Sequence, residues 1–381
     1  MKEVTIIGAG IGGLTTALAL EKKGIKVSIY EQAKTIKPLG AGIMLASNAM
    51  QVYRNLGIEE LLIANAAPLH AMNITNKDLK AFSKIDLQYF KHTYDLQSIS
   101  IHRGKLQQIL LDHLKTTNIY LDHQLKNLTK KKGGYLIEFE NGKTLQSSLL
   151  LGADGIHSQV RKVLFPESQI RTTNQVCWRG MANFTLPKIY QNELNEAWGT
   201  GDRFAFVQLN AHQMYWYAVK TFTQNNHEFS SKHLATYFKE YASIVTEIIQ
   251  QTPVESIHTT VMEDLKPIPN WHDEFACLLG DAAHATTPNM GQGACQAIED
   301  AYEIAKYIAQ YDSEKAFASF QNSRMPNAKK VVHQSWQIGK ISHWKHPIAV
   351  FLRNGLLRMT PKKINRIQLE RLFQLDKRLT S

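Results

Sequence analysis

The sequence is poor in cysteine and has no long hydrophobic run. Its 381 residues include three cysteines, Cys177, Cys277 and Cys295, and no two of them form a C-x-x-C pair. Such a set argues against a disulfide framework or a zinc site and is typical of a reducing compartment. No apolar run approaches the roughly 20 residues needed to span a bilayer, and no signal peptide precedes the first apolar run. We therefore expect a cytoplasmic protein that is not an integral membrane protein.

The charge balance is basic, but its pattern is not that of a nucleic-acid-binding protein. The formal net charge is +11. The lysine run at 130–132 falls in a predicted hairpin and is not interleaved with aromatic residues, so we expect no nucleic-acid partner. A solvated basic surface is the simpler interpretation, and a field that attracts an anionic substrate or a phosphorylated cofactor is the alternative. The length and the hydrophobic content of 44% suffice for two domains and a large core.

The first thirty residues predict a strand, a tight turn, a helix and a second strand. Residues 4–7 are a short apolar, β-branched run that is typical of a buried parallel strand. A G-x-G-x-x-G motif follows at 8–13, residues 14–23 predict a helix, and residues 26–30 predict the second strand. A glycine-rich turn without a ligand is the simpler alternative. The complete order is the context in which this motif indicates a dinucleotide site.

The three glycines and the acid that follows have distinct expected roles. Gly8 permits the tight turn, Gly10 lets the backbone approach a pyrophosphate, and Gly13 lets the helix pack close to the strand. The free N–H groups at the helix N-terminus favour phosphate. Glu31 ends the second strand and is placed to accept hydrogen bonds from an adenosine ribose. An acid there favours a ribose hydroxyl over a 2′-phosphate, so we expect FAD or NAD rather than NADP at this site.

Two segments between the first motif and residue 115 carry further candidates. Residues 37–43 form a glycine-rich loop in which Ala41 and Gly42 let the backbone pass close to a flat ligand, with an ordinary loop as the alternative. Residues 106–114 carry a helical apolar stripe, so Arg103 lies at a strand–helix junction. We interpret Arg103 as a phosphate or ribose contact in preference to a surface cation.

A second buried strand ends in an Asp-Gly pair. Residues 119–151 predict a strand followed by a three-stranded meander, with hairpin turns at 133–134 and 141–142. The last apolar run leads directly into Asp154 and Gly155. Taken alone, this is a strand–turn–helix with a good capping residue.

The middle of the chain has the composition of a substrate pocket. Residues 70–100 and 172–270 contain short alternating runs, and the second of these is rich in aromatic residues, which predicts a mixed sheet with one face on a cavity. Arg179 and Arg203 are candidate substrate anchors, with surface arginine as the simpler alternative. Trp216 is a candidate pocket aromatic, with plain core as the alternative.

A third buried strand ends in Gly-Asp. Residues 276–281 lead into Asp281, a glycine-rich loop follows, and residues 294–309 predict a long helix with one apolar side. A loop aimed at a helix N-terminus is suited to receive an anion. His284 has no Ser, Cys or second His at motif spacing, so we expect a structural, hydrogen-bonded histidine rather than a base.

The last stretch, residues 348–379, is amphipathic and rich in Lys and Arg. A packed terminal helix or a dimer contact is the first expectation, and a membrane-surface helix is the alternative. We expect a monomer or a homodimer.

The motifs at 8–13, 152–161 and 280–293 together resemble the class A FAD-dependent monooxygenases, the p-hydroxybenzoate hydroxylase-like group. Residues 40–43, with Asn48 and Ala49 beyond them, and residues 178–180 are similar to the branch of salicylate hydroxylase, urate hydroxylase and zeaxanthin epoxidase. The resemblance covers residues 3–330 and implies extended FAD, with NADPH or NADH as a transient co-substrate. The implied FAD contacts are Gly8, Gly10, Gly12, Gly13, Glu31, Ala41, Gly42, Arg103, Leu125, Asp154, Gly155, Asp281, Pro288, Gly291, Gln292, Gly293 and Ala294.

The resemblance also implies individual roles. Asp281 would bind the ribityl chain, and Asp154 and Gly155 match a motif linked to both FAD and nicotinamide binding. Residues 288–294 would wrap the isoalloxazine ring. The sequence departs from the family at Cys295, where Asn is frequent, so side-chain contacts from that position are not carried over.

The implied activity is hydroxylation of a small aromatic or heteroaromatic substrate, polycyclic ones included, by NAD(P)H and O2 through a flavin C4a-hydroperoxide. Antibiotic inactivation by oxygenation falls within this class. The substrate-pocket candidates are Arg179, Arg203, Trp216 and Pro288, and the sequence identifies no protein base. The alternatives are a flavin reductase or dehydrogenase of the same fold, without oxygen insertion, and a non-catalytic FAD-binding protein.

The expected fold is α/β. A Rossmann-like FAD-binding domain, with a parallel sheet and a three-stranded meander, comprises 1–70, 98–170 and 272–345. An inserted mixed-sheet substrate domain comprises 71–97 and 171–271. A C-terminal helical segment comprises 346–381.

Overall fold

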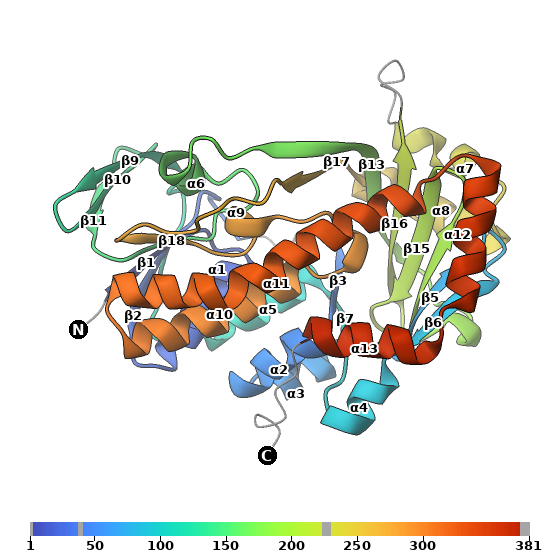
Figure 1. The fold of residues 1–381 in the computed structure, drawn as a ribbon, viewed down its shortest axis with the longest axis horizontal. Helices are drawn as coiled ribbons and strands as arrows, with labels where there is room; N and C mark the ends of the chain where they lie inside the picture. Colours follow the sequence, from blue (N-terminus) through green and yellow to red (C-terminus); the bar gives the residue numbers. More distant parts are fainter. Residues whose placement is uncertain (1–2, 37–40, 223–229, 374–381) are drawn as a thin grey trace.

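The computed structural model describes residues 3–36, 41–222 and 230–373. Its described strands form a five-stranded parallel sheet, a seven-stranded mixed sheet and two three-stranded sheets (Figure 1). The long helices cover one side of the parallel sheet and continue toward the mixed sheet. The expected α/β class is confirmed.

The parallel sheet is built from the short apolar runs that the sequence marks as buried strands. Its strand order is β18-β12-β1-β2-β8, and every neighbouring pair is parallel. Val4, Ile6, Val27 and Ile29 are fully buried, as a sheet covered on both faces requires. The strands are β1 (Glu3–Ile7), β2 (Lys26–Tyr30), β8 (Asn118–Tyr120), β12 (Leu150–Gly152) and β18 (Ala276–Leu278).

Four helices pack on and beside this sheet. They are α1 (Ile11–Glu21), α5 (Arg103–His113), α10 (Gly293–Gln310) and α11 (Ser313–Ser342). α1 contacts α5 and α10, and α10 contacts α11. The helix expected over 14–23 begins three residues earlier, because Gly12 and Gly13 already form its first turn. The helix expected over 294–309 is confirmed.

The predicted meander is also present. β9 (Leu125–Lys131), β10 (Gly134–Phe139) and β11 (Thr144–Ser147) pair in an antiparallel sheet. Gly133 and Gly142 each have a φ of +82° at the two turns, which is the conformation that two-residue hairpins demand.

The mixed sheet joins two segments that are distant in sequence. β5 pairs in parallel with β14, whereas the other neighbours are antiparallel. Strands from 71–97 and from 171–271 therefore share one sheet, while the division of the chain into domains stays a prediction. In sheet order the strands are β17 (His258–Leu265), β13 (Ile170–Asn183), β16 (Gln213–Thr221), β15 (Asp202–Gln208), β14 (Glu193–Trp198), β5 (Ala71–Thr75) and β6 (Ala81–Asp86).

Shorter elements complete the fold. A small sheet of β3 (Gly42–Leu45), β7 (Ile99–His102) and β4 (Ala67–Pro68) contacts β16 of the mixed sheet through β3. The segment expected to be helical over 230–250 is broken into η2 (Ser231–His233), α7 (Leu234–Tyr237) and α8 (Ser243–Gln250). The remaining elements are α2 (Ser47–Asn55), α3 (Glu59–Ala64), α4 (Gln88–Tyr94), α6 (Gln159–Leu164), η1 (Lys188–Tyr190), η3 (Val254–Ser256), α9 (Asp281–His284) and η4 (Pro288–Met290).

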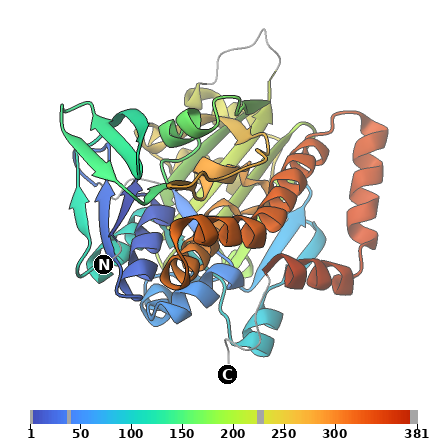
Figure 2. The same ribbon diagram turned by 60° about the vertical axis from the view of Figure 1, so that its left-hand side comes forward.

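The C-terminal amphipathic stretch forms two helices rather than one. α12 (Pro347–Met359) stands at the rim of the molecule, and α13 (Lys362–Phe373) turns back across the mixed sheet (Figure 2). Pro361 separates them, because proline disfavours helical geometry in the residue before it. Leu372 and Phe373 are buried, which confirms a packed terminal helix for α13, and residues 374–379 of the expected stretch lie outside the described part. Among the described helices, none combines the length and the apolar character needed to cross a bilayer.

Candidate active site

Three turns meet at one edge of the parallel sheet. β18, β12 and β1 are neighbours and run in the same direction, so their carboxyl ends lie side by side. The turns that leave these ends carry Asp281, Asp154 and Gly8 in turn. The crevice beyond the carboxyl ends is where α/β sheets bind their ligands. The structure therefore brings the three sequence motifs to one place.

The glycines of the first turn divide into two kinds. Gly8 has a φ of +106°, and a Cβ there would lie 2.5 Å from the Ala153 carbonyl oxygen. A Cβ on Gly13 would lie 2.0 Å from the Gly8 carbonyl oxygen. By contrast, a Cβ on Gly10 would have no protein atom within 4 Å. Packing thus accounts for Gly8 and Gly13, while Gly10 borders open space at the N-terminus of α1.

Glu31 is fixed beside this turn. The Ala9 N–H donates to Glu31 Oε2 at 2.7 Å, and the Ala33 N–H donates to Oε1 at 2.9 Å. A carboxylate oxygen accepts more than one hydrogen bond, so acceptor capacity remains for a ligand hydroxyl. The carboxylate is therefore held next to the glycine-rich turn, and the assignment of phosphate to that turn and of a ribose to Glu31 stays a prediction.

Arg103 and Asp281 face the same space from different elements. Arg103 is exposed at the first position of α5, and its backbone N–H donates to the Ala41 carbonyl at 3.1 Å. Asp281 begins α9, and its Oδ1 lies 3.9 Å from where a Cβ on Gly293 would be. Asp281 is exposed to water, yet protein atoms surround its carboxylate. The resulting desolvation raises the pKa of Asp281, and the electrostatic interactions with His284 and Arg103 oppose this shift.

Asp154 is committed to its own helix. Its carboxylate accepts from Ser158 Oγ at 2.5 Å, from the Gln159 N–H at 2.8 Å and from the Val160 N–H at 3.2 Å. Burial raises the pKa of Asp154, and these donors oppose the shift. Arg161 of α6 connects this turn to the turn that carries Asp281, because it donates to the Ala282 carbonyl at 3.0 Å. Asp154 therefore caps the first N–H groups of α6 and fixes the turn at the carboxyl end of β12. This turn forms part of the crevice beyond the parallel sheet, which we call the groove.

Four other predicted contact residues have clear packing roles. Gly12 faces Ala297 of α10, Gly42 approaches the Tyr215 side chain so closely that a Cβ would lie 2.5 Å away, and Leu125 is buried at the start of β9. Ala41 accepts the Arg103 hydrogen bond. Their assignment as cofactor contacts stays a prediction, and residues 37–40 of the predicted loop lie outside the described part.

The third motif ends at the open N-terminus of α10. The expected continuous loop contains two helical turns, α9 and η4, and Gly291 then takes a φ of +63°. Gln292 is the N-cap of α10 and makes no side-chain capping bond. The first N–H groups of α10 are therefore available to an anionic or electron-rich group. Cys295 is buried, with its Sγ 3.9 Å from the carbonyl oxygens of Met44 and Gly291, so its side chain packs inward.

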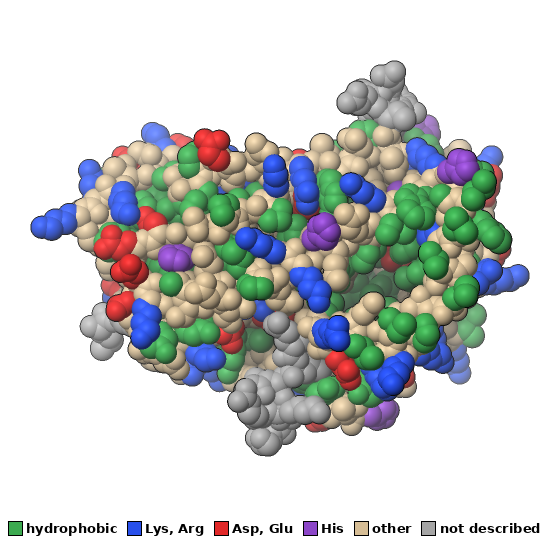
Figure 3. Space-filling view, in the orientation of Figure 1, with side chains coloured by type: hydrophobic (Ala, Val, Ile, Leu, Met, Phe, Trp, Pro, Cys, Tyr) green, Lys and Arg blue, Asp and Glu red, His purple; other side chains and the backbone are tan. Residues whose placement is uncertain are grey.

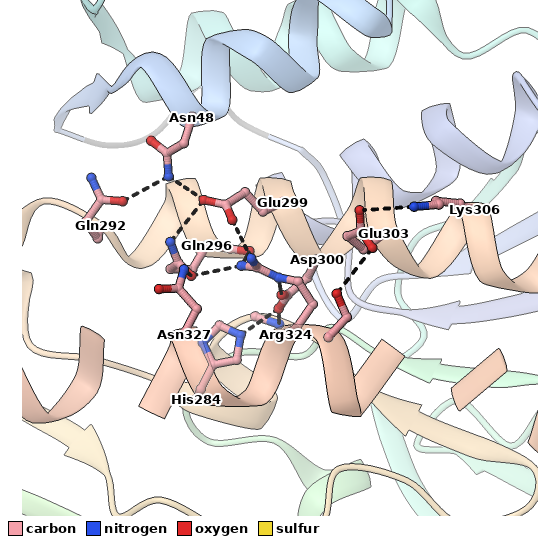
Figure 4. A network of polar contacts seen from close by, with 12 residues as sticks. Asn48, His284, Gln292, Gln296, Glu299, Asp300, Glu303, Lys306, Arg324 and Asn327 are labelled. Atoms are coloured by element: carbon pink, nitrogen blue, oxygen red, sulfur yellow. Dashed lines mark hydrogen bonds and ion pairs between the residues drawn. The ribbon is translucent and has the colours of Figure 1, made fainter. Parts of the chain in front are cut away.

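A buried network of charged and polar side chains contacts the third motif at Gly280 and His284 (Figure 4). Asp300 Oδ2 accepts from the Gly280 N–H at 3.0 Å and lies 2.6 Å from His284 Nε2, while Arg324 Nε donates to Asp300 Oδ1 at 2.8 Å. Arg324 also pairs with Glu299. The predicted hydrogen bonding of His284 is confirmed, and its structural role stays a prediction.

The same network reaches the loop that precedes α10. Asn48 of α2 donates to Gln292 Oε1 at 3.1 Å and also hydrogen-bonds Glu299. Sequence reasoning noted Asn48 only as part of the family resemblance and missed Glu299, Asp300 and Arg324. Two adjacent acids within the packed part of a predicted helix were the available signal, because buried carboxylates need partners.

This network predicts acid sensitivity. Burial alone would raise the pKa of Asp300, but His284 and Arg324 outweigh it and lower the pKa to about 2. Because this folded-state pKa lies below the unfolded value, the contribution of Asp300 to stability is complete above about pH 4 and is lost as the pH falls toward 2. We expect the difference in unfolding free energy between wild type and Asp300→Asn, roughly 2 kcal/mol or more, to shrink over that interval. Urea unfolding at several pH values measures it, and a difference independent of pH would contradict the assignment.

A cavity of about 640 Å³ lies between the mixed sheet, the loop at 289–292 and the C-terminal helices. The face in Figure 3 is hollowed between α11 and α13. α11 lines it with Lys330, His333, Gln334 and Gln337. The opposing wall of β5, β6, α12 and α13 supplies the apolar side chains Met72, Ile74, Ile85, Leu357, Leu369, Leu372 and Phe373.

The predicted pocket residues lie behind or beside this lining. Arg203 is buried and donates to Glu196 at 3.0 Å and to Asn289, both of which line the cavity. Trp216 is in the core, where its N–H donates to Thr252 Oγ1 at 2.8 Å, so it is not a lining residue. Arg179 and Pro288 also lie outside the lining set. Periodicity predicts that aromatic residues are buried but not which face of the sheet they occupy.

Comparisons with known proteins identify the family of the chain. The model of the family described as "FAD binding domain" matches residues 1–335. Aurachin C monooxygenase/isomerase of Stigmatella aurantiaca is 34% identical over 359 residues, which are 93% of this chain and 94% of that protein. The 2-heptyl-3-hydroxy-4(1H)-quinolone synthase of Pseudomonas aeruginosa is 31% identical over 379 residues, 97% of each chain.

Solved structures show the same fold. The crystal structure of Klebsiella pneumoniae HpxO complexed with FAD and uric acid superposes with a TM-score of 0.89 at 23% identity, over 98% of this chain and 97% of that chain. The family match spans all three turns and the whole parallel sheet. The chain therefore belongs to the FAD-binding-domain family, as an oxidoreductase of the class A FAD-dependent monooxygenase type whose cofactor is FAD.

Proposed function

We propose that the protein is an NAD(P)H-dependent monooxygenase that hydroxylates a 4(1H)-quinolone ring carrying an apolar side chain. The balanced reaction consumes substrate, O2, NAD(P)H and a proton, and yields hydroxylated substrate, water and NAD(P)+. The observation that carries the proposal is the cavity at 289–292. Its polar wall is the set of mainly polar side chains on α11, and its apolar wall is the cluster of apolar side chains on the sheet and C-terminal helices, which is interspersed with polar ones such as Asn73, Ser83 and Gln368. The relatives support it, since one is named for a heptyl-substituted hydroxyquinolone.

The residues of the groove fit extended FAD. Gly10 leaves open the position that a pyrophosphate needs, and Glu31 offers carboxylate oxygens at the end of β2. Arg103 and Asp281 offer a cation and an acceptor to the middle of the molecule. When bound, the flavin supplies the reduction and activation of O2.

The protein side of the chemistry is positioning and electrostatics. The uncapped N–H groups of α10 would stabilise negative charge that develops on the pyrimidine edge of the ring. The apolar wall of the cavity excludes water from the reacting edge, which limits wasteful loss of the activated oxygen. The polar wall orients the heteroaromatic ring, and the buried Arg203–Glu196 pair fixes Asn289 at the cavity surface.

The test compares two substrates on the FAD-loaded protein. We expect 2-heptyl-4(1H)-quinolone to stimulate oxidation of NADH or NADPH, with O2 consumed and hydroxylated quinolone formed in equal amounts. Each buried methylene contributes about 0.8 kcal/mol, so 4(1H)-quinolone without the chain should show a KM at least about a hundredfold higher. Equal turnover of the two compounds would contradict the assigned apolar wall. Anaerobic turnover without oxygen insertion would instead indicate a reductase.

Asp281→Asn tests the central contact. The change keeps the shape and one acceptor oxygen but removes the charge, and a hydrogen bond to a charged group contributes about 1.5–3 kcal/mol. We expect FAD to bind about 10- to 100-fold more weakly, measured by titrating the apoprotein with flavin. Asp273→Asn is the matched control, because Asp273 also follows a turn but bonds Lys130 and Tyr135 outside the groove. Unchanged FAD affinity in Asp281→Asn would remove this assignment.

A further inference from the structure

The outward face of α12 carries large apolar side chains that the described part of the protein leaves uncovered. They recur at a spacing of three or four residues or its multiples, which places them on one side of the helix. Contiguous exposed apolar surface of this kind marks an interaction site. We call it the α12 face, and its members are Ile348, Phe351, Leu352, Leu356 and Met359, which are 64%, 77%, 56%, 67% and 79% exposed.

The other side of α12 belongs to the cavity wall. Leu357 and Thr360, at the end of the helix, line the cavity. Arg353 is buried and anchors α12 by donating to the carbonyls of Ser342 at 2.9 Å and Gly199 at 3.3 Å. α12 therefore borders the cavity through Leu357 and Thr360 and presents the α12 face on its outer side.

The surroundings of the α12 face are basic. The stretch from Lys315 to Leu369 contains eleven Lys and Arg residues, of which Arg324 and Arg353 are buried, and no Asp or Glu, although the whole chain has 33 acids. Exposed cations flank the face before, within and after α12, namely Lys345, Arg358, Lys362, Lys363 and Arg366. An apolar stripe flanked by cations is complementary to the interfacial zone of an anionic lipid surface.

We propose that the α12 face docks on an anionic phospholipid bilayer, with α12 lying in the interface and not crossing it. At 1.5 Å per residue α12 is about 20 Å long, enough for several apolar side chains to enter the headgroup region together. A second copy of this chain fits less well, because a two-fold contact would bring two cationic, acid-free stretches together. Resting on the proposed function, this docking would set the cavity, which Leu357 and Thr360 line from the same helix, close to the lipid that carries an apolar-tailed quinolone.

Vesicle flotation of the FAD-loaded full chain tests the docking. We expect wild type to float with vesicles of phosphatidylcholine and phosphatidylglycerol. Binding should fall about tenfold or more with phosphatidylcholine alone or in high salt, because screening removes the attraction of the cations. The variant Phe351→Ser/Leu352→Ser/Leu356→Ser should lose binding while keeping wild-type thermal stability and FAD content. Ile189→Ser is the matched control, since Ile189 is 74% exposed on η1 and should not affect binding.

Three results would overturn the proposal. One is the absence of wild-type flotation, and another is flotation that the triple variant retains. The third is a dimer in size-exclusion chromatography that the triple variant dissociates, without vesicle binding, since the face would then join two copies. Flotation requires no turnover, so failure of the docking and failure of the quinolone assignment are measured separately.

Discussion

Replacing Gly10 with alanine is expected to remove most FAD from the purified protein while leaving the apoprotein as stable as wild type. Gly10 has a φ of −70°, which alanine adopts freely, and the new Cβ would meet no protein atom within 4 Å. The methyl group would instead occupy the space assigned to the pyrophosphate. Loss of one or two charge-assisted hydrogen bonds corresponds to about a hundredfold weaker binding. Flavin titration and apoprotein thermal unfolding measure the two effects.

Two variants sharpen this prediction. Gly355→Ala introduces the same methyl group into equally open space on α12 and should keep full FAD affinity. Gly13→Ala should lose both stability and FAD, because its Cβ would clash with the Gly8 backbone. If Gly10→Ala bound FAD as tightly as wild type, the pyrophosphate would not lie at this turn.

Replacing Arg324 with methionine is expected to destabilise the protein by about 3–5 kcal/mol, because it leaves the buried Glu299 without a cation and Asp300 with His284 alone. Arg324 joins Glu299 and Asp300 and also donates to Gln296 Oε1 at 2.8 Å. Asp300 in turn holds the Gly280 N–H and His284, so the turn before α9 should loosen as well. Denaturant unfolding gives the stability change, and flavin titration reports the turn.

The controls separate buried charge from charge in general. Lys306→Met removes an exposed cation that lies 3.9 Å from Glu303 on α10 and should cost less than about 1 kcal/mol. Adding Glu299→Gln to Arg324→Met should restore part of the lost stability, since one uncompensated buried charge is removed. Equal effects of Arg324→Met and Lys306→Met would show that burial does not dominate the network.

The cofactor groove was largely predictable because its signals are local. The spacing of Gly8, Gly10 and Gly13 between two apolar runs specifies a strand, a turn and a helix within thirty residues. Asp154 and Asp281 each follow a buried strand directly, and parallel strands place such turns at one edge. The contacts of these residues with FAD remain predictions, but their shared position follows from the sheet.

The substrate cavity was not predictable in the same way, because its walls come from segments hundreds of residues apart. Met72, Gln292 and Phe373 meet only when the mixed sheet, the loop before α10 and α13 have folded together. Alternation could mark Trp216 as buried, but only the packing of Phe204 and Thr252 shows that it faces the core. Likewise, Arg324 pairs with Glu299 across two helices, a contact that no sequence spacing encodes.

Isotope incorporation during turnover tests the proposed oxygen insertion most directly. The FAD-loaded protein would be supplied with NAD(P)H and 2-heptyl-4(1H)-quinolone, once under ¹⁸O₂ in ordinary water and once under ordinary O2 in H₂¹⁸O. A monooxygenase predicts one heavy oxygen atom in the product from ¹⁸O₂ and none from labelled water. Product that takes its oxygen from water, or reduced quinolone without added oxygen, would contradict the assignment.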